Sequence, residues 1–164
     1  MIVISDATPL HYLLLIGQEE LLFRMFGRVT VPSAVYRELQ RHRTPHLVRM
    51  WVANPPGWFE VREVAKDPGP APGSLGQGEW EAIALAQELK AELLLIDDRE
   101  GRREARRRLL AVIGTLGILE RGAERGLIDL PAVLTKLQET NFYLPAEAVQ
   151  SLLNQHSGRK KTEG

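Results

Sequence analysis

Two aspartates that directly follow a short apolar run are the side chains in this chain best placed to do chemistry. Residues 93–96 are aliphatic throughout and lead straight into Asp97 and Asp98. A short, wholly apolar run is typical of a strand buried on both faces of a parallel sheet. Because an unpaired buried carboxylate is costly, we expect these acids at the rim of the sheet, where open α/β sheets bind ligands.

A third aspartate, Asp6, follows the β-branched run 2–5 in the same way. Asp is also a preferred N-cap residue, so Asp6 could simply begin the next helix, unless Thr8 fills that role. Side chains alternate along a strand, so Asp97 and Asp98 leave the sheet on opposite faces. We expect Asp97 to be a ligand, and Asp98 to cap the next helix or to act as a secondary ligand.

Two glutamates lie on the apolar faces of predicted helices. Successive helical residues are about 100° apart, which places Glu79 among the apolar side chains of the predicted helix 79–90 and in its first turn. Glu38 falls among the apolar side chains of the helix that begins at Pro32. Each also has an ordinary structural explanation, because Glu79 could stabilise the helix dipole and Glu38 could pair with Arg41.

Carboxylates that converge at one rim repel one another, and their pKa values rise unless a cation neutralises them. The chain has no cysteine, and its four histidines show no metal-ligand spacing. An all-oxygen ligand set favours Mg²⁺ or Mn²⁺ over zinc. Such a site suits phosphodiester hydrolysis, because a metal lowers the pKa of bound water and stabilises charge on the leaving oxygen.

The elements that must position these acids alternate between strands and helices, which predicts an α/β fold with a mostly parallel sheet. We expect residues 93–96 to form the central strand and residues 59–64, where apolar and charged residues alternate, to lie at the edge. The other predicted strands are 2–5, 29–31 and 110–113. The predicted helices cover residues 10–16, 19–26, 46–54, 79–90, 99–108, 116–125, 131–139 and 145–155, and one begins at Pro32.

Length and composition indicate one soluble globular domain, because the chain has 164 residues, of which 44% are hydrophobic and 26% charged. We expect this domain over residues 1–156, followed by a flexible polar tail over residues 157–164. The 21 basic and 21 acidic residues cancel, so nucleic-acid binding would need a local basic patch. No apolar run could span a bilayer and the start lacks a basic leader, so we expect a cytoplasmic protein.

Four segments stand in a distinctive order: Ser5-Asp6, VPSAVYREL at 31–39, GQGEWEAIALA at 76–86 and LLIDDR at 94–99. The segment IGTLGIL follows at 113–119. Together they resemble the PIN-domain family, in particular its prokaryotic, toxin-like branch with a GExEAIALA helix and an LIDDR strand end. The resemblance extends from residue 2 to about residue 155. Trp80 departs from the pattern, since the family usually has a small residue there, and it could reshape the groove or a dimer face.

The resemblance implies a three-layer α/β/α fold with a central, mostly parallel sheet of four to five strands. It implies a Mg²⁺- or Mn²⁺-dependent ribonuclease, often the toxin of a type II toxin–antitoxin pair, commonly a homodimer, with RNA and a small antitoxin protein as partners. Its catalytic acids would be Asp6, Glu38, Glu79 and Asp97. Its metal ligands would be Asp6, Glu79, Asp97 and Asp98. Its auxiliary hydroxyl would come from Ser5, Thr8 or Thr115.

Six arginines within residues 99–108 form a local basic patch. Four of them share one side of the predicted helix because they are spaced at i, i+3, i+4 and i+7: Arg99, Arg102, Arg103 and Arg106. Guanidinium groups suit phosphate, so these four could hold an RNA backbone. A solvated face with internal Glu–Arg pairs, or an interface for an acidic partner, would explain the same pattern.

We therefore expect a metal-dependent endoribonuclease that acts as a toxin. The alternative is a catalytically inactive PIN-like module that binds RNA or protein. A phospho-acceptor receiver domain is a third possibility, because paired acids can bind a metal. It is disfavoured because Asp6 is single and Gly114-Thr115 stands where that fold needs a lysine.

Overall fold

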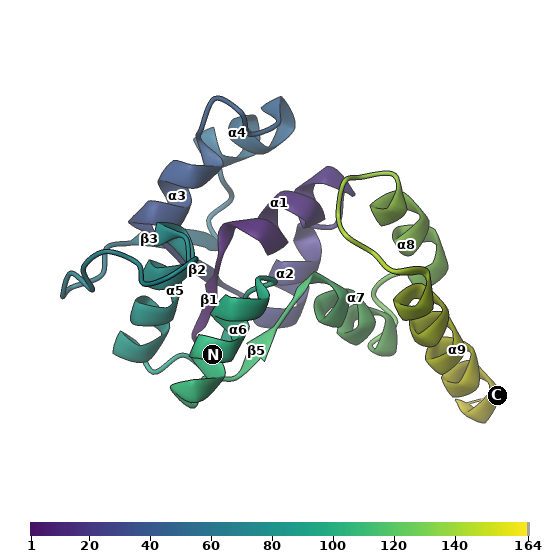
Figure 1. Ribbon diagram of the computed structural model, residues 1–164. Coiled ribbons are helices and arrows are strands. Elements are labelled where there is room, and N and C mark those ends of the chain that lie inside the picture. The colour runs from purple at the N-terminus through teal and green to yellow at the C-terminus, as the bar shows by residue number, and fades with distance from the viewer. Residues whose placement is uncertain (164) are drawn as a thin grey trace. The chain divides into compact units, whose positions relative to one another are not determined.

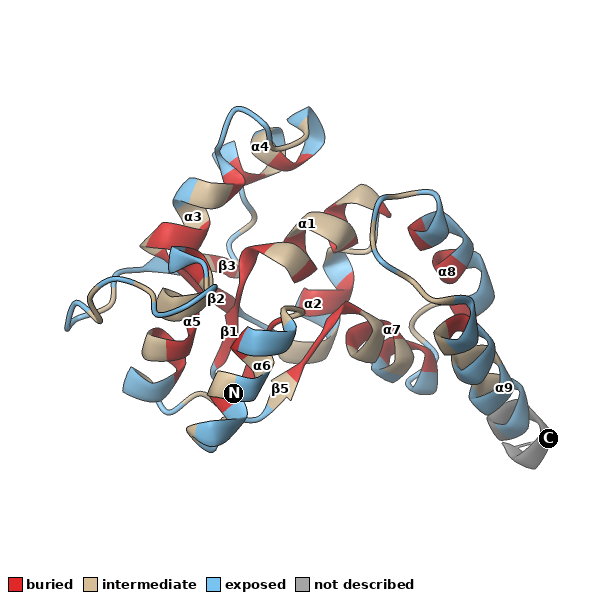
Figure 2. Cartoon of the chain, viewed as in Figure 1, coloured by how far each residue is buried: buried red, intermediate tan, exposed pale blue. Residues whose placement is uncertain are grey.

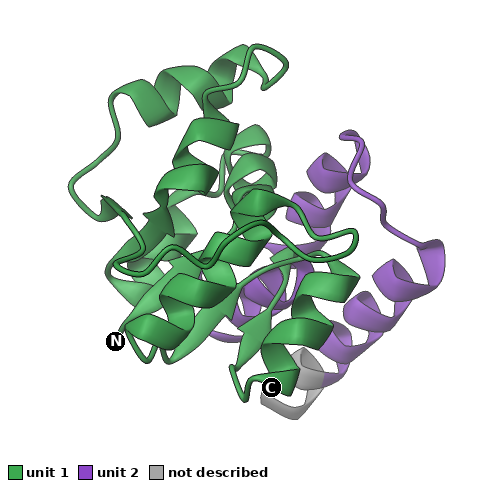
Figure 3. Ribbon diagram, turned by 60° about the vertical axis from the view of Figure 1, so that its left-hand side comes forward, with its two compact units in different colours: residues 1–115 green, residues 116–164 purple. Residues whose placement is uncertain are grey.

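A computed structural model describes residues 1–163 and shows the predicted alternation of strands and helices (Figure 1). The chain forms two compact units, Met1–Thr115 and Leu116–Gly164 (Figure 3). The last helix, α9 (Ala146–Glu163), takes in residues 157–163 of the predicted polar tail, and Gly164 lies outside the described residues. Within residues 1–163, no helix is long and apolar enough to span a bilayer.

The first unit is built on a five-stranded sheet in which every neighbouring pair is parallel. Its strand order is β3-β2-β1-β4-β5. The strands are β1 (Val3–Ser5), β2 (Val29–Pro32), β3 (Phe59–Arg62), β4 (Leu93–Leu95) and β5 (Val112–Ile113). This confirms the predicted parallel sheet and the edge position of β3. The prediction that the run before Asp97 forms the central strand is wrong, because β1 lies at the centre and β4 beside it.

The direction of the chain across the sheet reverses between β1 and β4. Strands β2 and β3 are added on one side of β1, and β4 and β5 on the other. Ser5 is in register with Leu95, and the Asp6 N–H donates to the Leu95 carbonyl at 2.8 Å. The carboxyl ends of β1 and β4 therefore meet at a topological switch point, where open α/β sheets bind ligands.

The core of this unit joins the sheet to helix α5 (Gln77–Glu88). Strands β1, β2 and β4 are buried along their whole length (Figure 2). The inward face of α5 contributes Ala82, Ile83, Leu85 and Ala86 to a cluster with Ile4 and Leu94. All four lie on the apolar side predicted for the helix 79–90, so the 3.6-residue period fixes which side of α5 meets the sheet.

The remaining helices of the first unit connect the strands. They are α1 (Ala7–Leu15), α2 (Glu20–Phe26), α3 (Ser33–Leu39), α4 (His46–Ala53) and α6 (Arg99–Arg107). Gly27 ends α2 with a φ of 79°, a conformation that favours glycine.

The second unit is helical. Helix α7 (Thr115–Glu124) begins on the last residue of the first unit and continues into the second. Helix α8 (Leu130–Gln138) packs on α9 and buries a stripe at i, i+3, i+4 and i+7, namely Leu130, Val133, Leu134 and Leu137.

Candidate active site

Asp6 lies at the end of the central strand with its side chain only 2% exposed. It occupies the N-cap position of α1, yet its side chain forms no capping hydrogen bond. Its Oδ1 atom is buried and makes no hydrogen bond within the part of the protein that the structure describes. Burial raises the pKa of Asp6 well above its ordinary value, and the charges of Glu79, Glu38 and Asp97 raise it further, while the Ala7 amide opposes them.

Asp97 is held by Thr115, the first residue of α7. The Thr115 N–H donates to Oδ1 of Asp97 at 2.8 Å, and the Thr115 hydroxyl donates to Oδ2 at 2.6 Å. Burial raises the pKa of Asp97, whereas the two Thr115 hydrogen bonds and the charge of Arg102 lower it. Of the three hydroxyls predicted as auxiliary groups, Thr115 is thus the one that contacts an acid of the predicted cluster.

The other two predicted hydroxyls lie elsewhere. The Ser5 hydroxyl is buried and donates to the Asp6 carbonyl at 2.8 Å, so it contacts the backbone and not a carboxylate. Thr8 is partly buried and lines a pocket together with Glu38.

Asp98 caps helix α6, which confirms one of the two roles predicted for it. Its Oδ2 accepts a hydrogen bond from the Gly101 N–H at 2.7 Å. The neighbouring acids therefore divide as strand alternation predicts, since Asp98 turns to α6 and Asp97 turns to the start of α7.

Glu79 also serves a helix terminus. It is the third residue of α5, and its Oε2 accepts a hydrogen bond from the N–H of the N-cap residue Gly76 at 2.6 Å, as the third-position glutamate of a capping box does. Burial raises its pKa most, the Gly76 hydrogen bond opposes this, and the charges of Asp98 and Glu38 raise it again. Glu79 thus stabilises the start of its helix, as the ordinary structural explanation predicts. It also lies close enough to Asp6 to raise the pKa of that carboxyl.

Glu38 and Asp6 approach each other across Gly78. A methyl group at Gly78 would lie 2.7 Å from Oε2 of Glu38 and 3.7 Å from Oδ1 of Asp6. Burial raises the pKa of Glu38, and the charge of Arg41 lowers it. Gly78 was not among the predicted site residues, although its place just before Glu79 in the GQGE segment was a usable signal.

The arginines of α6 fall into two groups. Arg102 is partly buried, lowers the pKa of Asp97 and lies beside Gly114, where a methyl group would be 3.1 Å from Nη1 of Arg102. The other three predicted RNA-binding residues, Arg99, Arg103 and Arg106, are exposed. Glu104 pairs with Arg107 and Arg108, and these contacts lower its pKa to about 2. At the end of α6, Arg107 and Arg108 are therefore engaged in pairs with Glu104, which is the internal Glu–Arg pairing that the sequence offered as an alternative to RNA binding.

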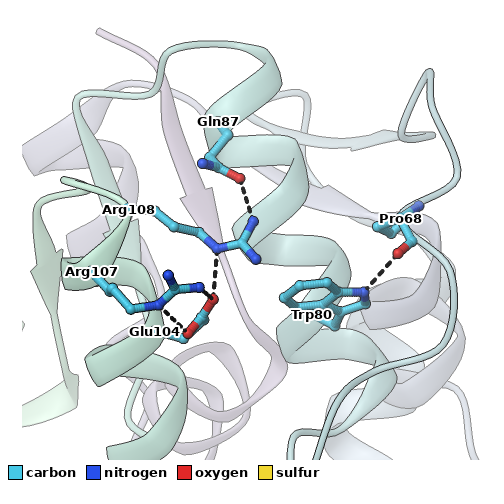
Figure 4. Close-up of polar contacts among 6 residues, drawn as sticks. All are labelled: Pro68, Trp80, Gln87, Glu104, Arg107 and Arg108. Carbon is cyan, nitrogen blue, oxygen red and sulfur yellow. Dashed lines mark hydrogen bonds and ion pairs between the residues drawn. The ribbon is translucent and has the colours of Figure 1, made fainter.

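Trp80, in α5, packs between α6 and the loop that contains Pro68, a proline-rich segment over residues 67–73 (Figure 4). Its indole N–H donates to the Pro68 carbonyl at 3.1 Å. The Arg108 guanidinium lies 4.7 Å from the ring centroid and also donates to Oε1 of Gln87 at 2.7 Å. The unusual tryptophan thus attaches the loop to α5 and α6.

The sequence agrees with this geometry, because a family model described as a PIN domain matches residues 2–158. The chain is a member of the PIN-domain family. PIN domains are generally nucleases, and these nucleases generally use divalent metal ions. No match was found among curated proteins.

A solved structure with the same fold is that of a PilT N-terminus domain protein from the hyperthermophilic archaeon Sulfolobus solfataricus P2. The similarity has a TM-score of 0.51 at 18% sequence identity and covers 88% of this chain and 100% of the other. It supports the PIN-like α/β/α fold. The strand order β3-β2-β1-β4-β5 also differs from the 2-1-3-4-5 order of flavodoxin-like folds such as receiver domains, which removes the third hypothesis.

The donor set of this PIN domain fits a hard divalent cation in part. Among the described residues, no three His, Cys, Asp or Glu side chains are close enough together to hold a metal ion as they stand. However, Oδ1 of Asp6 is buried without a partner, and the absence of a side chain at Gly78 leaves room between Asp6 and Glu38. A cation would supply the missing partner, and it would offset the burial and the neighbouring negative charges that raise the pKa of Asp6.

Proposed function

We propose that this PIN domain is a metal-dependent endoribonuclease that hydrolyses RNA phosphodiester bonds, with Mg²⁺ or Mn²⁺ as its cofactor. The observation that carries the proposal is Oδ1 of Asp6, which is buried at the β1–β4 switch point without a hydrogen-bond partner among the described residues, while Glu38, Glu79 and Asp97 lie near enough to raise the pKa of Asp6. Such an arrangement is costly for folding and is typical of sites where carboxylates serve chemistry.

Asp6, Glu79 and Asp97 would hold the ion, with Asp98 as a secondary ligand. When bound, the ion supplies a water of lowered pKa and stabilises charge on the leaving oxygen. Thr115 fixes the direction of the Asp97 carboxylate through both of its oxygens. Glu38 carries a raised pKa at a partly exposed position, so its Oε2 is suited to take a proton from the attacking water.

The biological role that we propose is that of the toxin in a type II toxin–antitoxin pair, acting as a homodimer and inhibited by a small antitoxin protein. Support comes from the GExEAIALA helix and the LIDDR strand end, which characterise the toxin-like branch. Expression of the chain alone in a bacterial host should arrest growth of the host cells, and expression of the Asp6→Asn variant should not. Co-expression of a small neighbouring reading frame should restore growth, and light scattering of the purified protein should give the mass of a dimer.

The deciding experiment is cleavage of structured and unstructured RNA in Mg²⁺, Mn²⁺ or EDTA. We expect cleavage with either ion, none with EDTA, and none by Asp6→Asn. Asp67→Asn is the matched control, because Asp67 is exposed and only stabilises its own turn by accepting the Gly69 N–H. Cleavage in EDTA would contradict the metal mechanism. RNA binding without cleavage under any condition would favour the inactive binding module instead.

A further inference from the structure

A pocket of about 320 Å³ opens beside the acidic cluster, and apart from Glu38 none of its lining residues has a role in the proposed reaction. Helix α1 contributes Thr8, His11 and Tyr12 to its wall. Glu38, together with Arg41 and Arg43 after the end of α3, forms the opposite wall. The volume is at the lower end of the range of about 300–1,000 Å³ seen for small-molecule sites.

The pocket adjoins the acidic cluster because Glu38 belongs to both. The Glu38 carboxylate faces Asp6 across Gly78, and the same side chain lines the pocket. On the other wall, Tyr12 lies in α1, six residues after the N-cap residue Asp6, and burial together with the negative charge of Asp97 raises the pKa of its hydroxyl. A group held in the pocket would therefore adjoin whatever is bound at Asp6 and Asp97.

One wall of the pocket carries aromatic rings, and the other carries two guanidinium groups together with the Glu38 carboxylate. The His11 and Tyr12 rings contact each other edge to face with centroids 4.8 Å apart, and both are partly exposed. Arg41 and Arg43 are exposed at the opposite wall. Aromatic rings stack on nucleobases, and guanidinium groups bind phosphate oxygens.

We propose that this pocket binds one nucleotide of single-stranded RNA next to the bond that is cut, with the base against Tyr12 and the phosphate at Arg41 and Arg43. This subsite rests on the proposed ribonuclease function, whose acids it adjoins. A base in a duplex is stacked and paired and cannot enter such a pocket, so the subsite selects unpaired RNA. It also gives the RNA a second basic contact in addition to α6.

The test measures binding separately from cleavage. The probe is a fluorescein-labelled single-stranded oligouridylate, compared with a hairpin of equal charge, and the protein is titrated in EDTA to prevent cleavage. Tyr12→Ala should weaken oligouridylate binding about 5- to 150-fold, as loss of one base stack does, whereas Tyr12→Phe should retain it. Arg43→Ala should lower the slope of log affinity against log salt by about 0.7, the value for one single-strand phosphate contact.

The matched controls are Tyr143→Ala, at a tyrosine that is 85% exposed, and Arg28→Ala, which removes a surface pair between the residue before β2 and Glu60 of β3. Neither should change binding. Equal affinity for oligouridylate and hairpin, or Tyr12→Phe as weak as Tyr12→Ala, would overturn the subsite. An unchanged salt slope in Arg43→Ala would also overturn it, and this test does not depend on the folding of the Tyr12 variants.

The two proposals fail in different ways. If the Tyr12 and Arg43 effects appear but no condition gives cleavage, the nucleotide subsite stands and the ribonuclease proposal does not. If cleavage requires Asp6 and a divalent ion but neither cleavage nor binding changes in the Tyr12 and Arg43 variants, the ribonuclease proposal stands and the nucleotide subsite does not. Direct binding of a fluorescein-labelled acidic peptide that Arg43→Ala weakens, with no binding of oligouridylate, would overturn the nucleotide subsite in favour of a protein partner.

Discussion

Thr115 holds both oxygens of the Asp97 carboxylate, its N–H donating to Oδ1 at 2.8 Å and its hydroxyl to Oδ2 at 2.6 Å. Thr115 is fully buried, so this contact is shielded from water. The start of α7 therefore sets the direction in which a strand-end carboxylate points. Groups that orient a ligand in this way commonly affect activity almost as strongly as the ligand itself.

Thr115→Val should lower kcat for RNA cleavage about 10- to 100-fold, because valine keeps the shape and the backbone hydrogen bond but loses the hydroxyl that fixes Oδ2. Thr115→Ser should keep most of the activity. Thr135→Val, at an exposed threonine of α8 whose hydroxyl bonds only the Pro131 carbonyl, is the control and should leave kcat unchanged. Equal activity of the valine and serine variants would show that the Asp97–Thr115 contact does not position the ligand.

Asp6→Asn should stabilise the metal-free protein at neutral pH. The folded-state pKa of Asp6 lies above its ordinary value of 3.8, so its contribution to stability is fully present below that value and is lost as pH rises through the folded-state pKa. Asparagine is never charged and avoids this loss. In urea unfolding with EDTA, the free energy of unfolding of the variant should rise relative to that of the wild type by up to about 1.4 kcal/mol per pH unit. This rise should occur between the ordinary pKa and the folded-state pKa of Asp6.

The comparison with Asp67→Asn makes this test specific, because an exposed aspartate should show no such gain. If wild type and Asp6→Asn keep a constant difference in unfolding free energy between pH 4 and pH 8, burial does not raise the pKa of Asp6.

Divalent ions should reverse that order of stability. An ion that binds only the folded protein adds about 2.7 kcal/mol at a free concentration one hundred times its dissociation constant, which corresponds to a rise in Tm of roughly 5–10 °C. Thermal scans with Mn²⁺ or Mg²⁺ should show this rise for the wild type and little for Asp6→Asn, and EDTA should abolish it. An equal shift in both proteins would place the ion away from Asp6.

Local pattern in the sequence predicted the positions of the acids better than their contacts. The helical period placed Glu79 and Glu38 on inward faces because that property depends only on spacing along one helix. The unpartnered Oδ1 of Asp6 was not predictable, since it depends on the pairing of β1 with β4. For the same reason the sequence misplaced β4 at the centre, because strand order follows from crossover connections and not from the hydrophobicity of one strand.

The choice among Ser5, Thr8 and Thr115 likewise needed three-dimensional information. Each stands near a predicted strand end or helix start, so their positions in the sequence do not distinguish them. Only the pairing of β5 with β4, with Ile113 in register with Leu95, brings the start of α7 beside Asp97.

Gly78→Ala should reduce cleavage while leaving the helix intact. Alanine in a helix ordinarily improves on glycine by about 0.5–1 kcal/mol, so a loss of function here cannot come from helix propensity. The added methyl group would lie 2.7 Å from Oε2 of Glu38 and 3.4 Å from Cγ2 of Val35, and it must displace the carboxylate from its place beside Asp6. We expect kcat to fall at least about 10-fold, because small displacements of catalytic groups are costly.

Gly158→Ala in α9 is the matched helical control, since a methyl group there would meet nothing within 4 Å. It should leave cleavage unchanged and match or exceed the wild type in thermal stability. Circular dichroism would verify that Gly78→Ala keeps its helical content, and the Mn²⁺-induced rise in Tm would report on the acidic site. A Gly78→Ala protein with full activity and an undiminished Mn²⁺ response would show that the approach of Glu38 to Asp6 is not needed for the chemistry.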